Sequence, residues 1–344
     1  MSNQTQAIGK TTGALPDGLV PGLAQTIAEH GYPVAQETAG LVVSAPEGRL
    51  EARLDEDGLT VTIGAAGSAE LHMIREAFLH VLDDAAPGVS GRMRWEGDVA
   101  KTTYPPNFRK ARFVAAEPVS RNFLRVTLEA DKVEDFREGG MHFRLALPPQ
   151  GREPIWPRLD EAGRTQWPKG DDALHNPAYT FVAIEPDERR FSFDLFVHEG
   201  GLATRWAQTA QVGDVIGIMG PGGGKPPESD FLLIAGDETA LPAIRRILEL
   251  SPADRRGHVF LEIGDPGDQM PLAAPSGMNV EWLQRGEGSG LWDRLSAVDL
   301  PPAGSSRFVW IAAERALATK ARRHFRDHLR LTARESYISA YWTA

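Results

Sequence analysis

The sequence predicts a multidomain protein, in which a small α+β domain precedes an antiparallel six-stranded β-barrel and a C-terminal α/β domain. A chain of 344 residues is too long for one ordinary core, so two or three domains are expected. The middle third is rich in short strand-like segments, whereas the last third alternates strands with helices. The expected parts are a disordered lead at 1–18, the α+β domain at 19–100, the barrel at 108–228 and the α/β domain at 229–344.

The region before the barrel carries the patterns of a compact α+β domain. Residues 1–18 are polar and rich in Gly and Thr, and they are therefore expected to be disordered. One helix is expected after Asp17, and a second helix begins at Ser68 and ends at a Pro-Gly pair. Between the helices, GRLEARLDEDGLTVTIGAAG alternates apolar and polar residues around Asp57-Gly58, which predicts a β-hairpin. GRMRWEG can close the sheet, and TTYPPNF is the expected linker.

The middle third predicts the barrel. Six segments are rich in β-branched and aromatic residues: ARFVAAEPVS, FLRVTLEA, MHFRLALPP, AYTFVAIEP, RFSFDLFVH and DVIGIMGP. One helix, EGGLATRWAQTAQVG, lies between the fifth and sixth strands, an arrangement typical of a small closed or Greek-key barrel. The Pro-, Gly- and Trp-rich stretch 149–177, between the third and fourth strands, is expected to be a surface excursion.

The last third predicts a mostly parallel sheet with helices on both faces, because strands and helices alternate along it. The expected strands are FLLIAG, HVFLEIG, NVEWLQR, RFVWIAA and SYISAYW. The expected helices are ETALPAIRRILEL, SGLWDRLSAV and ERALATKARRHFRDHL.

The composition excludes several classes of function. A formal net charge of −10 argues against nucleic acid as the main partner. The lack of cysteine excludes disulfides, zinc–thiolate sites, iron–sulfur clusters and a thiol nucleophile, and it fits a reducing cytoplasm. The N-terminus lacks the apolar core of a signal peptide, and no apolar run approaches the ~20 residues of a membrane span. A soluble, cytoplasmic protein is therefore expected.

Several short segments together resemble one family. They are FDLFVHEGG at 193–201, TRWA at 204–207, GDVIGIMGPGGG at 213–224, GDETALPA at 236–243 and a terminal AYW. Over residues 108–344 the chain resembles the siderophore-interacting proteins, which are FAD-containing ferric-siderophore reductases built on the ferredoxin-reductase plan. The first ~100 residues resemble a small uncharacterised domain that is sometimes fused to this family. No activity follows from that second resemblance.

The resemblance implies an FAD-dependent NAD(P)H oxidoreductase that reduces ferric siderophores and releases Fe(II) in the cytoplasm. FAD is expected on the barrel, and NADPH or NADH on the α/β domain. Reduction releases the metal because hard oxygen donors hold Fe(III) better than Fe(II), so the protein needs no iron ligands of its own. His324 and His328 lie four residues apart without an acidic third ligand, and no metal site is expected.

The glycine turn before TRWA predicts a phosphate site, because Gly200 and Gly201 let the backbone approach and a helix start offers free N–H groups. The resemblance places the FAD pyrophosphate there. The residues implied to hold FAD are Tyr179, Thr180, His198, Gly200, Gly201, Ala203 and Thr204. A lone histidine at a strand end is also compatible with a purely structural role.

The turn from Gly236 to Ala240 carries two acids, Asp237 and Glu238, where other nucleotide-binding proteins carry glycines. Asp237 or Thr239 can cap the following helix, and acids are favoured at its positive end. Such a turn suits flavin or nicotinamide better than a pyrophosphate, with the Thr239 hydroxyl facing the cofactor. The alternative is a capped helix and nothing more.

Two further features complete the expected site. Tyr341 and Trp342 are expected to cover the flavin, or else to pack the last strand. The expected catalytic residues are accordingly Thr239, Asp237 and Trp342. On the basic helix, Arg322, Arg323 and Arg326 can attract an anionic siderophore or the 2′-phosphate of NADPH, or they form a solvated face.

The chain departs from the family around HNPAYTFVAI, residues 175–184. The family usually has arginines before and after the tyrosine, whereas this chain has Asn176, Pro177 and Val182. The loss of one arginine–phosphate contact removes ~1.5–3 kcal/mol, so reduced FAD affinity is expected, unless Arg144 or Arg205 substitutes. The alternative function is a non-catalytic or weakly flavin-binding regulatory protein on the same scaffold.

Overall fold

The computed structural model describes residues 5–29 and 32–344. The chain divides into two compact units, which are described separately here. The first unit comprises the chain up to Phe108 together with 148–174. The second unit comprises 109–147 and 175–344.

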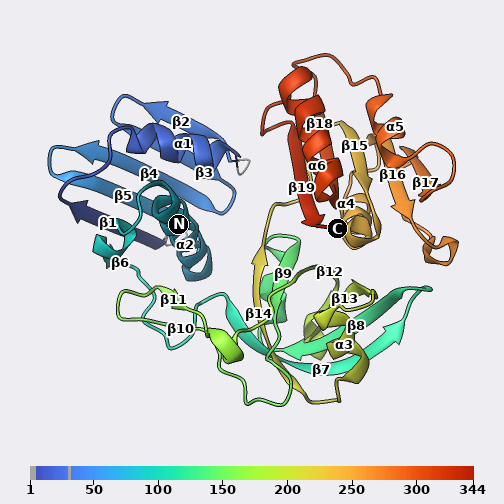
Figure 1. The fold of residues 1–344 in the computed structure, drawn as a ribbon, viewed down its shortest axis with the longest axis horizontal. Coiled ribbons are helices and arrows are strands. Elements are labelled where there is room, and N and C mark those ends of the chain that lie inside the picture. The colour runs from blue at the N-terminus through green and yellow to red at the C-terminus, as the bar shows by residue number, and fades with distance from the viewer. Residues whose placement is uncertain (1–4, 30–31) are drawn as a thin grey trace. The chain divides into compact units, whose positions relative to one another are not determined.

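The first unit is an antiparallel six-stranded sheet with two helices on one face (Figure 1). The strand order is β2-β3-β4-β5-β1-β6. The strands are β1 Thr5–Thr12, β2 Val34–Glu37, β3 Gly40–Ala45, β4 Gly48–Asp55, β5 Gly58–Ala65 and β6 Arg94–Gly97, and the helices are α1 Leu19–Glu29 and α2 Ser68–Ala85. The expected hairpin is confirmed, since β4 and β5 pair in register from Gly48↔Ala65 to Asp55↔Gly58.

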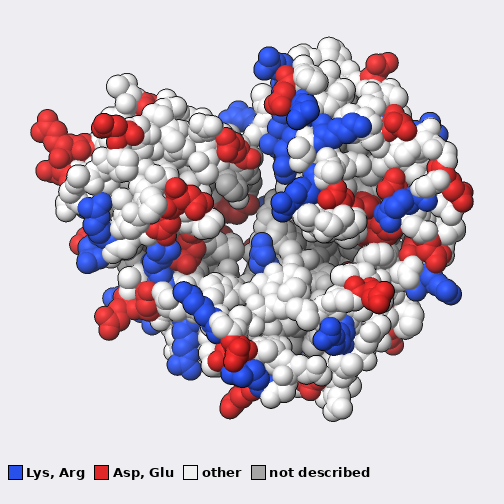
Figure 2. Space-filling model, viewed as in Figure 1, with Lys and Arg blue, Asp and Glu red and all other residues white. Residues whose placement is uncertain are grey.

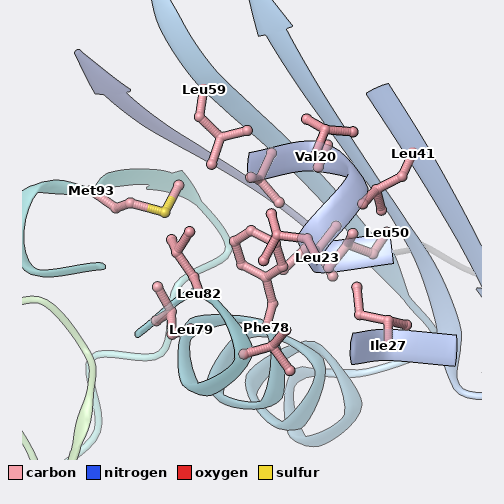
Figure 3. Packing of buried hydrophobic residues seen from close by; sticks show 14 of the residues in the cluster. Val20, Leu23, Ile27, Leu41, Leu50, Leu59, Phe78, Leu79, Leu82 and Met93 are labelled. Atoms are coloured by element: carbon pink, nitrogen blue, oxygen red, sulfur yellow. The ribbon is translucent and has the colours of Figure 1, made fainter. Parts of the chain in front are cut away.

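The core of this unit lies between the sheet and the two helices. Leu23 and Ile27 of α1 and Phe78 and Leu82 of α2 point toward Leu50 and its neighbours on the sheet (Figure 3). The apolar residues of α1 and α2 recur at helical spacing, which turns one stripe of each helix inward. The sheet and the two helices thus share one core.

The expectation of a disordered lead at 1–18 is wrong for the described part of that segment. Thr5–Thr12 forms β1, which pairs with β5 on one side and with β6 on the other. The inward positions include the small residues Ala7 and Gly9, and at Gly9 the side chains of Met93 and Trp95 occupy the space that a side chain would need. A Cβ at Gly9 would lie 2.8 Å from each of those two side chains.

The stretch between the third and fourth barrel strands belongs to the first unit rather than forming a free excursion. It contains β10 Arg158–Leu159, β11 Thr165–Gln166 and a 3₁₀ turn, η3, at Gly170–Asp172. Helix α2 binds it through two buried side chains. His72 Nε2 lies 2.9 Å from the Thr165 hydroxyl, and Arg75 donates to the carbonyl oxygens of Ala162 and Gly163.

The second unit begins with the expected barrel, which is closed in the order β12-β13-β8-β7-β14-β9. Its strands are β7 Phe108–Pro118, β8 Phe123–Ala130, β9 His142–Ala146, β12 Ala178–Glu185, β13 Arg190–Phe196 and β14 Val215–Gly222. Helix α3, Leu202–Thr209, lies between the last two strands. The 3₁₀ turns are η2 Val133–Arg137 and η4 Pro186–Glu188. Packed phenylalanines fill the interior, among them Phe143, Phe181 and Phe191.

The α/β domain is the expected parallel sheet, in the order β17-β16-β15-β18-β19. Its strands are β15 Phe231–Gly236, β16 Arg256–Ile263, β17 Gly277–Gln284, β18 Arg307–Glu314 and β19 Ser336–Trp342. Its helices are α4 Leu241–Glu249, α5 Leu291–Ser296 and α6 Arg315–Arg322, which continues as a π-helical turn, η7, at Arg323–His328. Helix α4 packs on one face of the sheet, and α5 and α6 pack on the other.

Two buried carboxylates join the α/β domain to the barrel. Asp194 on β13 accepts hydrogen bonds from Arg125 Nε at 2.8 Å and from Arg245 Nη2, on α4, at 2.6 Å. Asp268, in the 3₁₀ turn η6 at Pro266–Asp268, accepts three hydrogen bonds from Ser120 and Asn122 in a barrel turn. The mouth of the barrel and the first helix of the α/β domain are therefore held against one another.

Candidate functional site

The turn that follows β15 is organised around the carboxylate of Asp237, which is 3% exposed. Its Oδ1 accepts the backbone N–H of Thr239 at 2.9 Å and the Thr239 hydroxyl at 2.5 Å. Asp237 therefore caps the one-turn 3₁₀ helix η5, Glu238–Ala240, that leads into α4. Burial raises the pKa of Asp237, and the hydrogen bonds from Thr239 oppose that rise.

Glu238 was expected to be held by the helix N-terminus, but its carboxylate binds partners outside the helix. Its Oε1 accepts the backbone N–H of Gly264 at 2.6 Å, at the end of β16, and its Oε2 receives Arg285 Nη2 at 2.5 Å. Arg285 also bonds Glu262 at 3.2 Å. Glu238 thus ties the ends of three neighbouring strands together. Sequence reasoning missed this network because its members lie far apart along the chain.

The end of the chain reaches the same turn. Trp342 Nε1 donates to Asp237 Oδ2 at 2.7 Å, so Asp237, Thr239 and Trp342 form one cluster. Tyr341 packs edge-on against Trp310, with ring centroids 6.3 Å apart. Tyr341 and Trp342 are each 40% exposed, which leaves open ring surface beside the turn.

This cluster lies where the α/β domain meets the barrel. Helix α4 begins directly after the turn and packs against β12. Arg245 on α4 then reaches Asp194 on β13. The carboxyl ends of parallel strands are the usual place for ligands in open α/β sheets. The geometry therefore presents one buried acid, one hydroxyl and one indole at that edge.

On the barrel, Tyr179 and Thr180 occupy the start of β12. The Tyr179 ring packs on Phe193, with centroids 4.7 Å apart, and burial raises the pKa of its hydroxyl. The antiparallel register pairs Phe181 with Phe193. The start of β12 therefore lies beside the end of β13, which leads into the turn before α3. Tyr179 and Thr180 thus occupy the end of β12 that neighbours the strand leading to the glycine turn.

The glycine turn has an open and uncapped helix start. Gly200 has φ of 76° and no atom within 4 Å of a Cβ position. Gly201 is the N-cap of α3 and supplies no side-chain acceptor. A Cβ on Gly201 would lie 2.8 Å from the His198 ring and 3.0 Å from Thr204 Oγ1. The first N–H groups of α3 consequently remain available to an anion.

The family-typical arginines are replaced around β12 without a direct substitute in place. Arg144 on β9 pairs opposite Ala178 and donates to the backbone oxygen of Asn176 at 3.1 Å. Arg205 lies in the first turn of α3 and is exposed. In the described part of the chain its guanidinium has no hydrogen bond or ion pair. Arg205 is thus a cation next to the glycine turn that can pair with an anion.

The comparisons with known proteins agree with this geometry. Residues 112–225 match the family model for the siderophore-interacting FAD-binding domain, and residues 229–344 match the model for siderophore-interacting protein. Ferric vibriobactin reductase ViuB from Vibrio cholerae is 31% identical over 241 residues, which cover 67% of this chain and 87% of that protein. The chain belongs to the siderophore-interacting protein family.

Other relatives cover the same two domains. The NADPH-dependent ferric-chelate reductase of Escherichia coli K12 is 30% identical over 249 residues, covering 69% of this chain and 93% of that protein. A siderophore utilization protein from T. fusca superposes with a TM-score of 0.61 at 28% identity, covering 70% and 95% of the two chains. The siderophore-interacting protein SipS from Aeromonas hydrophila gives 0.58 at 27% identity, covering 70% and 100%.

The basic helix of this siderophore-interacting protein is partly engaged internally. Figure 2 shows Lys and Arg gathered over the region where Figure 1 places α6. Arg322 Nε donates to the Ile338 carbonyl oxygen at 3.1 Å, and Arg326 bonds the hydroxyl and carbonyl oxygens of Ser336. These two arginines therefore fasten the helix to β19. Arg323 is exposed and has no such bond in the described chain.

Two absences apply to the described residues only. Within 5–29 and 32–344, no group of three or more His, Asp or Glu side chains is placed to hold a metal ion. Among the helices that the structure describes, none has the length and apolar character to cross a membrane.

Proposed function

We propose that this chain is an NAD(P)H-dependent flavoprotein that reduces ferric siderophores and releases Fe(II) in the cytoplasm. The observation that carries the proposal is the cluster of Asp237, Thr239 and Trp342 at the carboxyl end of β15, beside the barrel. Relatives of 30% identity or more are named ferric vibriobactin reductase and NADPH-dependent ferric-chelate reductase. Family membership over both domains supports the same activity.

The residues of the barrel fit FAD. The turn before α3 leaves a cradle that a Cβ at Gly201 would fill, next to uncapped N–H groups and the exposed Arg205. This turn would hold the pyrophosphate, with His198, Gly200, Ala203 and Thr204 forming its walls. Tyr179 and Thr180 would hold the ring system. Bound FAD would accept a hydride from the nicotinamide and pass single electrons to the ferric complex.

The residues of the α/β domain would serve the nicotinamide side. Gly236 to Ala240 would border the dinucleotide, with the buried Asp237 fixing both the Thr239 hydroxyl and the Trp342 indole. Because the Thr239 proton is donated to Asp237, the remaining lone pairs of its hydroxyl are free to accept a hydrogen bond from a ligand. The aromatic pair Tyr341 and Trp342 would exclude water from the ring edge. Arg323 would attract the anionic siderophore.

A visible spectrum of the purified protein, with an FAD titration of the apoprotein, tests cofactor binding. Anaerobic addition of NADPH or NADH should bleach the flavin band, and a ferric siderophore should then restore it, with Fe(II) trapped by a ferrous-specific chelator. Bleaching without Fe(II) release would indicate a different acceptor.

One observation favours a second function. Asn176, Pro177 and Val182 stand where the family carries arginines, and Arg144 is directed to the backbone of Asn176. A binding or regulatory protein with weak or no FAD affinity would fit these replacements. The loss of one arginine should still permit FAD binding at tens of micromolar. If FAD fluorescence is not quenched by the apoprotein in that range, the second function is favoured.

A further inference from the structure

A pocket separate from the candidate site lies within the unit that carries the barrel and the α/β domain. Its volume is about 400 Å³, which lies in the range of small-molecule sites. Three segments line it. They are the end of η2 with the loop to Met141, the connection between β14 and β15 at Lys225–Pro226, and the end of α4 with Arg246 and Leu250. The cluster of Asp237, Thr239 and Trp342 does not contribute to it.

The floor of this pocket is aromatic. Phe136 and Phe181 both line it and are 2% and 1% exposed. Their rings stack with centroids 4.8 Å apart and an interplanar angle of 23°. Met141 adds a third apolar side chain to the lining. The ring faces are covered by one another, by Phe143 and by Arg109, so the pocket offers an apolar body the ring edges and Met141.

The walls carry more positive than negative charge. Arg137, Lys225 and Arg246 line the pocket, against the single carboxylate of Glu138. This local excess of cations contrasts with the formal net charge of −10 of the whole chain. Cations gathered at the rim of a concave apolar surface raise the local concentration of anions.

Arg246 is the most informative of these cations. Its neighbour on α4, Arg245, pairs with Asp194 at 2.6 Å. In the part of the chain that the structure describes, the guanidinium of Arg246 has no hydrogen bond or ion pair, and its Nε is buried without a partner. An unsatisfied donor of this kind is uncommon in native proteins and calls for an explanation, such as a bound partner.

The loop that forms one wall is held in place by close backbone contacts. A Cβ on Gly140 would lie 2.0 Å from the carbonyl oxygen of Gly222 and 2.2 Å from that of Gly223. A Cβ on Gly139 would lie 2.0 Å from Pro221. The two glycines let this loop sit directly on the end of β14, which fixes the wall near Arg137 and Glu138.

We propose that this pocket binds a small organic anion, a carboxylate on an aromatic or aliphatic body. The carboxylate would pair with Arg246 and Lys225, and the body would contact Met141 and the ring edges of Phe136 and Phe181. Because the walls come from the barrel, the connection between β14 and β15, and α4, such a ligand bridges the barrel and the α/β domain. The proposal depends on neither FAD nor the reductase activity.

Binding of 4-fluorobenzoate to the full chain, followed by ¹⁹F NMR line broadening, tests the proposal. Saturable binding is expected. Arg246→Gln should weaken it about tenfold to a hundredfold, as the loss of a charge-assisted hydrogen bond implies. Glu138→Gln should tighten it several-fold because it removes the opposing charge. The neutral probe 4-fluorobenzamide should bind at least about tenfold more weakly than the carboxylate.

Arg256→Gln is the matched control, since Arg256 is exposed at the start of β16 and lies outside the pocket. It changes the net charge equally and should leave binding unchanged. If thermal unfolding shows that Arg246→Gln is not folded, two other variants test the proposal. Lys225→Gln should weaken binding of 4-fluorobenzoate and Glu138→Gln should strengthen it. Equal weakening by Arg256→Gln and Arg246→Gln, equal binding of the two probes, or no saturable binding overturns the proposal.

Discussion

The indole of Trp342 donates a hydrogen bond of 2.7 Å to the carboxylate of Asp237, and the two residues lie 105 positions apart in the chain. The contact joins the last strand of the α/β domain to the turn after its first strand. The Thr239 hydroxyl donates to the other oxygen of the same carboxylate. Asp237 is consequently the residue through which the chain terminus and the start of α4 are positioned together.

Removal of the indole donor should change the titration of Asp237. The hydrogen bond from Trp342 opposes the rise in the Asp237 pKa that burial causes, so Trp342→Phe should raise this pKa further. Carbon-13 NMR of the side-chain carboxyl across pH measures the shift. Trp292→Phe changes a tryptophan on α5 in the same domain and should leave Asp237 unaffected. An unaltered titration in Trp342→Phe would show that the hydrogen bond does not form.

Thr239→Val should act in the same direction and also slow the proposed reduction. The variant keeps the shape of the side chain but removes both its donor to Asp237 and its free acceptor. The loss of about one hydrogen bond, ~0.5–1.5 kcal/mol, predicts a few-fold to roughly tenfold lower rate of flavin reduction by NAD(P)H. Stopped-flow absorbance measures the rate. Thr239→Ser keeps the hydroxyl and should retain most of it; equal rates in Thr239→Val and wild type would reduce this turn to a helix cap.

Asp194→Asn should destabilise the second unit. The substitution removes the carboxylate with which both Arg125 and Arg245 form ion pairs, and the Asp194 side chain is only 1% exposed. We expect a loss of about 3 kcal/mol in the free energy of unfolding, at the low end for a broken buried pair because Arg125 is partly exposed. Urea unfolding measures it. Asp131→Asn breaks an exposed pair with Arg189 and should cost less than about 1 kcal/mol.

The first unit should lose stability in acid through His72. Burial and the nearby Arg75 lower the pKa of His72 from 6.5 to about 4. The unfolded chain therefore binds the proton first, so the stabilisation is complete above pH 6.5 and decreases as the pH falls toward 4. The expected loss across this window is about 3 kcal/mol.

Hydrogen-exchange protection factors of α2 amides at several pH values measure this loss. His72→Gln should flatten the dependence, although it also alters the contact with Thr165. His80→Gln, on the exposed side of the same helix, should preserve the wild-type slope. A slope that survives in His72→Gln would assign the acid sensitivity to another group.

Gly201→Ala should weaken FAD binding. The added methyl would meet the His198 ring at 2.8 Å and narrow the turn where the pyrophosphate is proposed to lie. Gly290→Ala is the matched control, because Gly290 is likewise a helix N-cap with ordinary φ and no atom within 4 Å of a Cβ. Fluorescence titration with FAD measures both variants. Equal affinity in the two would place the pyrophosphate elsewhere.

The six barrel strands and the parallel sheet could be predicted from the sequence because each strand is an apolar or alternating run bounded by turn residues. Strand β1 was missed because its inward residues are Ala7, Gly9 and Thr11, which give almost no hydrophobic signal. The absence of a side chain at Gly9 is explained by Met93 and Trp95, which pack against it and lie far along the chain.

The candidate site was predictable where a local rule applies. Asp237 caps a turn two residues away, and a capping rule predicts that bond. Glu238 looked equivalent to it, but its partners Gly264 and Arg285 are 26 and 47 residues away. Those residues reach Glu238 because β16 and β17 lie next to β15 in the sheet. The hydrophobic periodicity of a sequence predicts strands but does not specify their order. The same holds for Arg245 and Asp194.

The chain leaves the first unit at Phe108 and returns to it only for residues 148–174. During synthesis, the sheet and both helices of this unit are complete before the barrel strands β7, β8 and β9 leave the ribosome. The buried faces of His72 and Arg75 nevertheless stay uncovered until about 65 more residues have been made, roughly 3–13 seconds at ordinary elongation rates. The nascent first unit therefore exposes the side chain of Arg75 during that interval. A deletion that begins the chain after Phe108 would leave residues 148–174 without α2, the helix that they pack against.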